Sequence, residues 1–566
     1  MNCSTRFKLT TVALLVGSAM NANAALYKIV EVDPALNGSS STYNEAYGVA
    51  IQQGDVAFET GCFANGANCT DDQFKLALET RVSVDGVSYR EELPFAMDAT
   101  FGYIQEFDDF ERYCYNELRY STCETWASIH WAPWYKELSK DYTSNALAFV
   151  EKDLDAGEEE PNAYQNKYNN VINSLTSSGL PVGNQSVLKD DKTDLETRNT
   201  VVAPVTPQGD FYQSRAWKTD GTYTVGSVSS KTGNENGTHY TSKAAIWDAA
   251  GVVKQLDWPQ VADRDGERLA QGSMRDVVVD STNNKVYGVG YNTYADDNYI
   301  NASVFVGTFD ASGTFENSSW DTKQVSGAQM KISGDIIHSN SVVTNVNSNF
   351  IAIGEAKRAG GKPSEGSAAN RLFLVKDVRA ESVSATFLPE LGGIFFSGAG
   401  GKMGGINKYN EIVGQLDAED TREIDGKPRR KRAFILPYEA NGSVESRISI
   451  FDNKAWYLDD LTNGSNAPVE NNQYRIIDAT DINDAGVISA TAIKCEGGYD
   501  TTAHNSYCGE GSKEETVVAV KLIPIADADA SNINTRPVEK AAAERSGAGL
   551  GWLSLTLLVL FGFRRK

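Results

Sequence analysis

The sequence predicts a mainly β protein, in which a propeller-like repeat domain carries one helical insertion. Two observations support this fold class. A turn rich in Asn, Asp and Gly recurs before a short β-branched strand, and one stretch, residues 101–178, instead spaces its apolar residues as a helix does. Repetition of one β unit along a chain is the sequence signature of propellers and solenoids.

The recurring turn occurs in four places. Asn, Asp and Gly tolerate the left-handed backbone of a tight turn, and the β-branched residues that follow favour a strand. The copies begin roughly 60 to 75 residues apart, and units of this kind bury their apolar faces only against their neighbours. They occupy residues 280–290, 345–354, 406–414 and 482–490.

Short apolar strands often accompany this turn. They occur at residues 244–247, 371–374 and 432–435. Both a propeller and a solenoid fit such a pairing of turn and strand, because each unit needs its neighbours to cover its apolar side. We favour the propeller.

The N-terminus has the pattern of a secretory signal peptide over residues 1–24. Arg6 and Lys8 precede an apolar run, and Ala22 and Ala24 form a small-x-small cleavage site. We therefore expect the export machinery to carry the chain across the inner membrane and signal peptidase to cut it before Ala25. The alternative is a membrane anchor that is never removed.

The C-terminus has a short apolar segment, residues 550–563, between small residues and a basic cluster. Arg564 and Arg565 would hold the end of the chain on the cytoplasmic side of a membrane, with the rest of the chain outside. The segment is marginal for a span of about 30 Å. This combination favours a sorting signal over a permanent anchor.

The glycine motif of the tail, Gly547-Ala-Gly549, resembles the GlyGly-CTERM tails of Gram-negative bacteria. That resemblance implies a rhomboid-type sorting protease as a partner and delivery to the cell surface. The pairing of I-N-x-x-x-x-I-V-G with a later R-A-F-I resembles HAF-type extracellular repeats, with residues 46–49 as a degenerate first copy. The whole chain resembles an uncharacterised Gram-negative envelope family, a domain of unknown function. It supplies no catalytic residues.

Six cysteines remain after the predicted signal peptide, in three close pairs. An even number in an exported chain predicts disulfides, although six cysteines allow 15 connectivities. We expect local pairing, and a zinc site is the weaker alternative because no pair has Cys-x-x-Cys spacing. The pairs are Cys62 with Cys69, Cys114 with Cys123 and Cys495 with Cys508.

Composition divides the chain into seven segments. The order is a signal peptide, a first β-repeat segment, a helical insertion, a polar connector, the main β-repeat domain, a polar linker and the sorting tail. Their predicted ranges are 1–24, 25–100, 101–178, 179–208, 209–526, 527–546 and 547–566.

The chain carries a formal net charge of −23, which argues against a nucleic-acid partner. We find no intact nucleophile elbow, zinc-protease helix, phosphate-binding loop or dinucleotide fingerprint. The sequence therefore predicts no cofactor. Two acidic turns resemble fragments of calcium loops but lack the full ligand set, so we predict no metal site.

Two groups of residues are candidates for ligand binding. Trp126, Trp131 and Trp134 would suit stacking on sugar rings, or they simply bury one face of a helix. Arg429, Arg430 and Arg432 would suit lipid phosphates or an acidic glycan. Alternatively, they form a basic strand end that pairs with the acidic residues nearby.

The leading interpretation is an exported, surface-delivered or membrane-anchored binding or scaffold protein of unknown ligand. Its partner would meet loops on the propeller face nearest the helical insertion, because loops vary while strands hold register. The alternative is an exported hydrolase or lyase acting on a glycan, which would need paired carboxylates near the central funnel. A purely structural envelope protein is a third interpretation.

Overall fold

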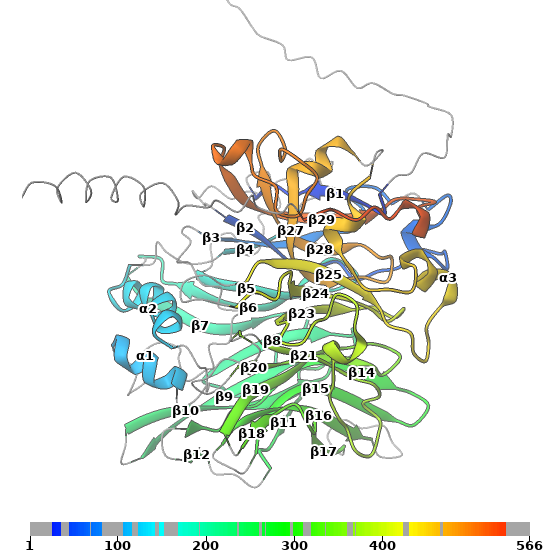
Figure 1. Cartoon of the computed structure of the whole chain (residues 1–566). Helices are drawn as coiled ribbons and strands as arrows, with labels where there is room; N and C mark the ends of the chain where they lie inside the picture. Colours follow the sequence, from blue (N-terminus) through cyan, green and yellow to red (C-terminus); the bar gives the residue numbers. More distant parts are fainter. Residues whose placement is uncertain are drawn as a thin grey trace, which may run out of the picture.

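Figure 1 shows the protein as a computed structural model. The described part of the chain leaves out the predicted signal peptide and sorting tail, so neither is placed. The structure describes residues 25–34, 45–67, 69–81, 106–115, 123–141, 147–151, 168–191, 193–234, 237–259, 263–265, 268–294, 298–309, 318–333, 335–358, 366–367, 370–422, 429–464 and 468–538.

The fold is a seven-bladed β-propeller, which confirms the predicted fold class. Each blade is an antiparallel sheet whose innermost strand, counted as its first strand, lies next to the innermost strands of the two neighbouring blades. In blade 5 this first strand is β19, because the short β18 is an extra strand that precedes it. The first four blades are as follows. Blade 1 has β2 (Glu45–Ile51), β3 (Leu76–Arg81) and β4 (Leu147–Val150); blade 2 has β5 (Tyr168–Leu175), β6 (Pro181–Leu188) and β7 (Leu195–Val202); blade 3 has β8 (Gln213–Thr219), β9 (Thr224–Asn234), β10 (Gly237–Trp247) and β11 (Val253–Leu256); blade 4 has β14 (Ser273–Asp280), β15 (Lys285–Thr293), β16 (Ile300–Thr308) and β17 (Ser319–Gln324).

The remaining three blades follow in chain order, and a small hairpin of β12 (Arg264–Asp265) and β13 (Arg268–Leu269) lies outside them. Blade 5 has β18 (Met330–Ile332), β19 (Asp335–Val346), β20 (Ala352–Arg358), β21 (Arg371–Val375) and β22 (Thr386–Phe387); blade 6 has β23 (Gly401–Ile406), β24 (Glu411–Asp417), β25 (Lys431–Pro437) and β26 (Trp456–Tyr457); blade 7 has β27 (Tyr474–Ile482), β28 (Ile488–Cys495) and β29 (Glu515–Pro524).

The N-terminal strand closes the ring. β1 (Tyr27–Glu31) pairs antiparallel with β29 and becomes the outermost strand of blade 7, nearly 500 residues away along the chain. Ala25, Leu26 and Tyr27 are fully buried there. The N-terminal segment is therefore part of the last blade, while the first blade begins only with β2.

Apolar cores lie between successive blades. Val289 of blade 4, for example, packs in one cluster with Val343 and Phe373 of blade 5. This arrangement explains the repeat, since no blade could bury its apolar side alone.

The helical insertion is shorter than predicted. Its two described helices are α1 (Phe107–Tyr113) and α2 (Glu124–Leu138). The predicted range 101–178 also contains β4 and all of β5, the third strand of blade 1 and the first of blade 2. β4 is short and polar residues interrupt β5, so both strands carry little strand signal in the sequence.

The predicted connector, residues 179–208, is instead mostly strand. It forms β6 and β7 and completes blade 2. Polar residues such as Asn184 and Ser186 are buried in β6. Because those positions are polar, the segment has the composition of a loop although its backbone is paired.

The recurring turn joins the first strand of a blade to the second. In blades 5, 6 and 7 the turn begins at Asn347, Asn407 and Asn483, and the backbone N–H of the fourth turn residue donates to the carbonyl of the first. That fourth residue is Phe350, Asn410 or Gly486, each with positive φ. The left-handed position explains why Asn and Gly recur in this motif.

Each first-position asparagine links its blade to the next. The Nδ2 of Asn347 donates to the carbonyl of Asn407 at 2.9 Å, and that of Asn407 donates to the carbonyl of Asn483 at 3.1 Å. The Nδ2 of Asn483 then donates to the carbonyl of Gln52 in blade 1 at 3.0 Å. These three hydrogen bonds link blades 5, 6, 7 and 1 in succession at one end of the ring. We call this series of bonds the asparagine relay.

Every innermost strand also contains a β-bulge. In blades 2, 4 and 7 the side chain of the residue after the bulge bonds to the following blade: the Oγ of Ser174 donates to the carbonyl of Trp217, while Asp276 accepts from the N–H of Val346 and Asp481 from that of Ile51. Bulges re-aim side chains, and in these three blades they aim polar groups at the next blade. The post-bulge residues are Ala50, Ser174, Lys218, Asp276, Asn345, Gly405 and Asp481.

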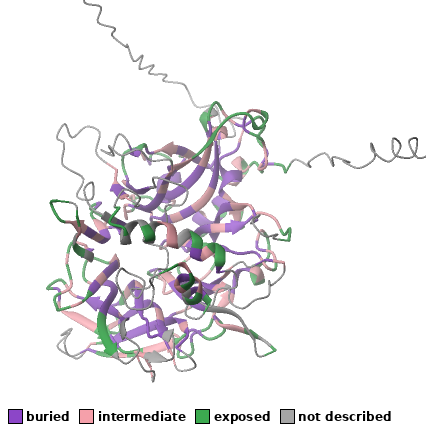
Figure 2. Cartoon of the chain, turned by 90° about the vertical axis from the view of Figure 1, so that its left-hand side faces the viewer, coloured by how far each residue is buried: buried purple, intermediate pink, exposed green. Residues whose placement is uncertain are grey.

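The two ends of the ring differ. α1 and α2 lie at the left of the ring in Figure 1, and α3 (Glu445–Ile448) lies at the right. In Figure 2, which looks onto that left-hand side, the two helices cross in front of the blades. We call this end, where second strands lead into third strands, the helix-covered face. The opposite end, with the asparagine relay, is the turn face.

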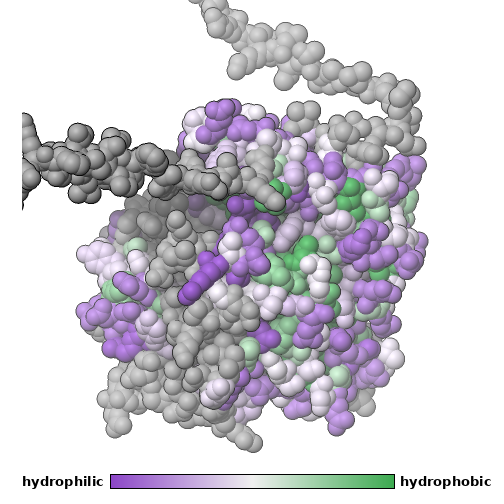
Figure 3. Space-filling model, viewed as in Figure 1, coloured by the Kyte–Doolittle hydropathy of each residue, from purple (hydrophilic) through white to green (hydrophobic). Residues whose placement is uncertain are grey.

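Figure 3 shows one side of the ring. In Figure 3, hydrophobic residues on the visible side form small patches among hydrophilic ones. Scattered apolar residues of this kind are normal on a folded protein.

The three predicted disulfides are present, so local pairing is confirmed. Sequence separations are 7, 9 and 13 residues for Cys62–Cys69, Cys114–Cys123 and Cys495–Cys508. Disulfides are consistent with an exported protein. The first lies on the turn face, and the other two lie on the helix-covered face.

Candidate functional site: the helix-covered face

The two helices form an aromatic cap that a disulfide holds together. Cys114 follows α1 and Cys123 precedes α2, so their bond fixes the two helices to each other. The ring of Phe110, fully buried, lies 6.1 Å from the ring of Trp126 and 5.9 Å from that of Trp131. Edge and tilted contacts at these distances are favourable for aromatic pairs.

The outer surface of the cap carries exposed tyrosines. Tyr115 is 46% exposed and Tyr135 is 58% exposed, and the ring of Tyr135 lies 5.7 Å from that of Trp131. The side chain of Trp134 lies outside the described residues. The cap therefore buries part of its aromatic surface and presents the rest to solvent.

Blades 3 and 4 contribute a cation–aromatic stack on their inner strands. The guanidinium of Arg275, in β14, lies 3.4 Å from the ring centroid of Trp217 in β8 and 5.3 Å from that of Tyr291 in β15. Arginine over an indole face is attracted by the ring quadrupole. The stack holds a cation and two rings in one fixed arrangement.

A second aromatic pair lies at the start of blade 3. The rings of Tyr212 and Tyr240 are 4.7 Å apart, and the ammonium of Lys231 lies within 6 Å of both ring centroids. Tyr240 is buried, which raises its pKa, whereas Tyr212 is 39% exposed. Of the two tyrosines, only Tyr212 is exposed enough to contact a ligand.

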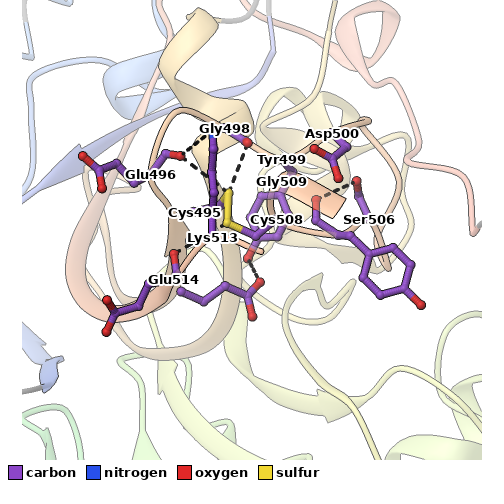
Figure 4. The surroundings of a disulfide bond; sticks show 12 residues. Cys495, Glu496, Gly498, Tyr499, Asp500, Ser506, Cys508, Gly509, Lys513 and Glu514 are labelled. Atoms are coloured by element: carbon purple, nitrogen blue, oxygen red, sulfur yellow. Dashed lines mark hydrogen bonds between the residues drawn. A yellow bond between two sulfur atoms is a disulfide. The ribbon is translucent and has the colours of Figure 1, made fainter. Parts of the chain in front are cut away.

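The loop between β28 and β29 is built around the third disulfide (Figure 4). The hydroxyl of Tyr499 donates to Glu515 at 2.7 Å, and the carboxylate of Asp500 accepts from the N–H of Glu510 at 2.7 Å. Tyr507, beside Cys508, is 67% exposed. The disulfide and these hydrogen bonds thus fix the conformation of the loop, while the side chain of Tyr507 faces solvent.

A buried charge network underlies this disulfide loop. Asp459 pairs with Arg432 at 3.0 Å, and the two ring nitrogens of His504 face Asp459 at 3.6 Å and Asp460 at 3.1 Å. Burial alone would raise the pKa of Asp459, but His504 and the arginines outweigh it and hold that pKa well below its usual range.

Inside the ring, two carboxylates share one lysine. The Nζ of Lys218 lies 3.0 Å from Asp276, and the negative charges of Asp276 and Asp481 both raise the pKa of this lysine against the opposing effect of burial. Burial raises the pKa of Asp481 to about 6. Both carboxylates accept backbone N–H groups of the next blade, so both hold blades together.

A family model described as "Protein of unknown function (DUF3466)" matches residues 4–206 and 210–566. The chain belongs to this DUF3466 family. The match covers all seven blades, so the whole propeller is the family's unit.

No curated protein matches the chain in sequence. Among solved structures it is similar to the Bombyx mori GH32 beta-fructofuranosidase BmSUC1, at 8% sequence identity and a TM-score of 0.20. The alignment covers 74% of this DUF3466 chain and 66% of that enzyme, so the chain spans just under two thirds of the enzyme's length. A likeness at this TM-score carries no argument about function.

The basic cluster of this DUF3466 protein is largely paired. Arg429 is buried, and its guanidinium contacts Asp417 at 3.3 Å and donates to the carbonyls of Thr421 and Gly398, both at 2.7 Å. Lys431 also pairs with Asp417. Arg432 is buried and forms an ion pair with Asp459. Of the three predicted arginines, Arg430 is therefore the one whose side chain is partly exposed.

Several features of the site have no signal in the sequence. Trp217, Arg275 and Asp276 come from two strands, and nothing in their local sequences marks them as neighbours. The one usable signal is positional: Asp481 stands two residues before the first asparagine of a repeated turn. This offset identifies a position on the innermost strand of a blade, but it does not indicate a chemical role for the residue there.

The described residues contain neither a metal-binding cluster nor a membrane-spanning helix. Within the described ranges, no group of three or more His, Cys, Asp or Glu residues could hold a metal ion. In the same part of the chain, no helix is long and apolar enough to cross a membrane.

Proposed function

We propose that this DUF3466 protein is an exported binding protein of the cell envelope, which holds its ligand on the helix-covered face. The distribution of exposed tyrosines carries the proposal. Among the described residues, four tyrosines are exposed large side chains, and all four belong to this face. They are Tyr115, Tyr135, Tyr212 and Tyr507.

Tyrosine suits a binding surface for physical reasons. It offers a large contact area with two side-chain torsions to fix, and its hydroxyl can still donate or accept a hydrogen bond. On the turn face, the turns of blades 5, 6 and 7 are already engaged in the asparagine relay and are less free to contact a ligand. A partner is therefore best accommodated by the longer connections on the helix-covered face.

Export and surface delivery are part of the same proposal. The signal pattern before Ala25 and the three disulfides support passage through the export machinery, with removal by signal peptidase. The motif Gly547-Ala-Gly549 and the basic end at Arg564 and Arg565 support a sorting role for the tail, with a rhomboid-type protease as processing partner. HAF-type repeats fit an extracellular propeller.

Replacing the cap tests the binding proposal. Thr80 of β3 and Leu147 of β4 are paired neighbours, so a short Gly-Ser loop can replace residues 83–145 without disturbing blade 1. The tagged wild-type chain should recover a partner from solubilised envelopes, identified by mass spectrometry and sugar analysis. The variant should keep the wild-type circular dichroism spectrum and lose that partner.

Two point variants give a matched comparison. Tyr507→Ser removes an exposed aromatic side chain from the helix-covered face, and Phe58→Ser removes one that is 42% exposed from the turn face. We expect the first to weaken capture and the second to leave it unchanged. Capture that survives cap replacement and Tyr507→Ser but is lost in Phe58→Ser would place the binding surface on the other end and refute the proposal.

One observation favours the alternative, a glycan-active hydrolase or lyase. Asp276 and Asp481 are two carboxylates inside the ring, and the pKa of Asp481 is raised to about 6, as a general acid requires. Release of reducing ends from polysaccharides measures this activity. If it were found, and lost in a folded Asp481→Asn variant, the enzyme would replace the binding protein as the function.

A further inference from the structure

The segment after the last strand runs from one face of the ring to the other. It begins on the turn face, where the N–H of Asp527 donates to the carbonyl of Phe63 at 2.9 Å. It ends on the helix-covered face, where the N–H of His504 donates to the carbonyl of Pro537 at 2.9 Å. We call residues 527–538, the described part of the predicted linker 527–546, the strap.

Arg536 fixes the end of the strap to the helix-covered face. Its side chain is buried, its Nε donates to the carbonyl of Asp459 at 2.7 Å, and its Nη1 donates to the carbonyl of Thr502 at 2.9 Å. Its backbone N–H donates to the carboxylate of Asp460 at 2.7 Å. A buried arginine that bonds to two separate segments is a fixed contact of the fold.

The docked strap decides where the chain leaves the folded body. β29 ends at Pro524, where it meets the start of β1 on the turn face, so a free segment would leave the ring there. With the strap docked, the chain leaves after Val538, next to the disulfide loop that carries Tyr507. Val538 is 66% exposed and Tyr507 is 67% exposed. The strap therefore moves the exit of the chain from the turn face to the helix-covered face.

The chain between the strap and the apolar tail is short. Eleven residues, 539–549, separate Val538 from the apolar segment 550–563, which Arg564 and Arg565 would hold in a membrane with its end on the cytoplasmic side. A linker of this length reaches at most about 36 to 40 Å and spans about 18 Å on average as a flexible coil. The strap itself already needs a similar number of residues to run from one face to the other. The linker would therefore be used up in returning to the turn face.

We propose that the strap orients this protein on the membrane: while the tail is attached, the helix-covered face lies against the bilayer and its exposed tyrosines meet the lipid headgroups. This inference rests on the sorting tail of the proposed function. Removal of the tail would release the same face for its ligand.

The surface around the exit suits the headgroup region. The four exposed tyrosines of the described residues all lie on this face. Tyrosine combines an apolar ring with a hydroxyl that forms hydrogen bonds, and it is enriched where membrane meets water. The net charge of −23 provides no attraction to anionic lipids. The tail therefore supplies the attachment, and the strap supplies the orientation.

Quenching by spin-labelled headgroups tests this orientation. The chain from Ala25 to Lys566 is reconstituted in vesicles of phosphatidylethanolamine and phosphatidylglycerol with a headgroup-labelled lipid, and one fluorophore is attached through a new cysteine. The six native cysteines are paired, so they do not react. Tyr135→Cys reports on the helix-covered face, and Leu180→Cys, at the turn between β5 and β6, reports on the turn face. The two native side chains are matched in exposure, at 58% and 51%.

We expect the headgroup quencher to reduce the fluorescence of the Tyr135→Cys label and to leave that of the Leu180→Cys label unchanged. Inserting about 30 Gly and Ser residues after Val538 leaves the strap docked but lengthens the average span of the linker to about 35 Å. Quenching at the two positions should then become similar, because the longer linker lets the propeller turn over.

Flotation with the vesicles separates the possible failures. A chain that does not float has no membrane-held tail, which overturns both the sorting role of the tail and this inference. A chain that floats, but is quenched equally at both positions or more strongly at Leu180→Cys, overturns the orientation alone. Quenching confined to Tyr135→Cys that the insertion does not weaken would also overturn it, because the short linker would then not set the orientation.

Discussion

Removing the side chain of Asn407 should destabilise the propeller by about 3 kcal/mol. This asparagine begins the turn of blade 6 and is buried. Its Oδ1 accepts from the N–H groups of Tyr409 and Glu411 at 3.0 and 3.1 Å. Its Nδ2 donates to the carboxylate of Glu411 at 2.6 Å and to the carbonyl of Asn483 at 3.1 Å.

The magnitude comes from these four hydrogen bonds. A neutral hydrogen bond contributes a net stability of about 1 kcal/mol, and one to a charged group about 1.5 to 3 kcal/mol. The simple sum for Asn407→Ala is therefore about 5 kcal/mol, and relaxation of the turn with entry of water reduces it. Asn407→Asp keeps the two accepted bonds but turns a carboxylate toward two acceptors, so it should destabilise at least as much at neutral pH.

The other blades supply an internal ranking. Asn347 also accepts two turn N–H groups and donates two bonds, but all four partners are neutral, so Asn347→Ala should cost slightly less than Asn407→Ala. Asn483 accepts from Val487 and donates to Gln52, so its replacement should cost about 2 kcal/mol. Asn441→Ala is the control, because that side chain is exposed.

Urea unfolding followed by tryptophan fluorescence and circular dichroism measures these differences, provided that the two probes give one transition. The reasoning would be refuted if Asn407→Ala unfolded within about 0.5 kcal/mol of Asn441→Ala, the range expected for surface changes. A ranking in which Asn483→Ala was the most damaging would also contradict it, because that side chain makes the fewest bonds of the three.

Two further predictions concern the closing blade. Lys521 of β29 is buried, and its ammonium donates to both carboxylate oxygens of Glu151 at 2.9 and 2.8 Å. Lys521→Met should therefore lower the free energy of unfolding by about 3 to 5 kcal/mol, because the Glu151 carboxylate loses its partner. The double variant with Glu151→Leu should recover most of this loss in thermal unfolding, and no recovery would refute the ion-pair account. Replacing Cys495 and Cys508 by serine should cost about 2 to 3 kcal/mol, because the loop is short; an unchanged unfolding midpoint would show that hydrogen bonds alone hold the loop.

Local patterns in the sequence were sufficient for part of this fold. The repeated asparagine turns, the apolar stretches within the third strands of blades 3, 5 and 6 and the close cysteine pairs each depend on neighbouring residues, and each is present. Blade 2 was missed because β6 and β7 have buried polar residues such as Asn184, so composition points to a loop.

The candidate site was less predictable because its contacts join distant segments. Trp217 and Arg275 stack across two blades, and Arg432 meets Asp459 only after blade 6 is folded. Trp126 and Trp131, two of the three predicted tryptophans, do lie together with Phe110, yet nothing in their spacing reveals which part faces solvent. Charge patterning alone suggested a basic surface at residues 429–432, although pairing with Asp417 and Asp459 removes most of it.

The closing blade explains why so many long-range contacts gather in one place. A propeller ring has no covalent closure unless a disulfide joins its ends, and here the three disulfides are all local. Closure therefore depends on β1 pairing with β29, on Lys521 with Glu151 and on the N–H of Asp527, which donates to the carbonyl of Phe63. An unpaired β29 would also expose a strand edge that invites pairing with another chain. The junction of blades 7 and 1 is thus where the ring would open first, and the same blade carries the disulfide loop and Tyr507 to the helix-covered face. Contacts that keep the ring closed consequently also fix the position of one part of the proposed binding surface.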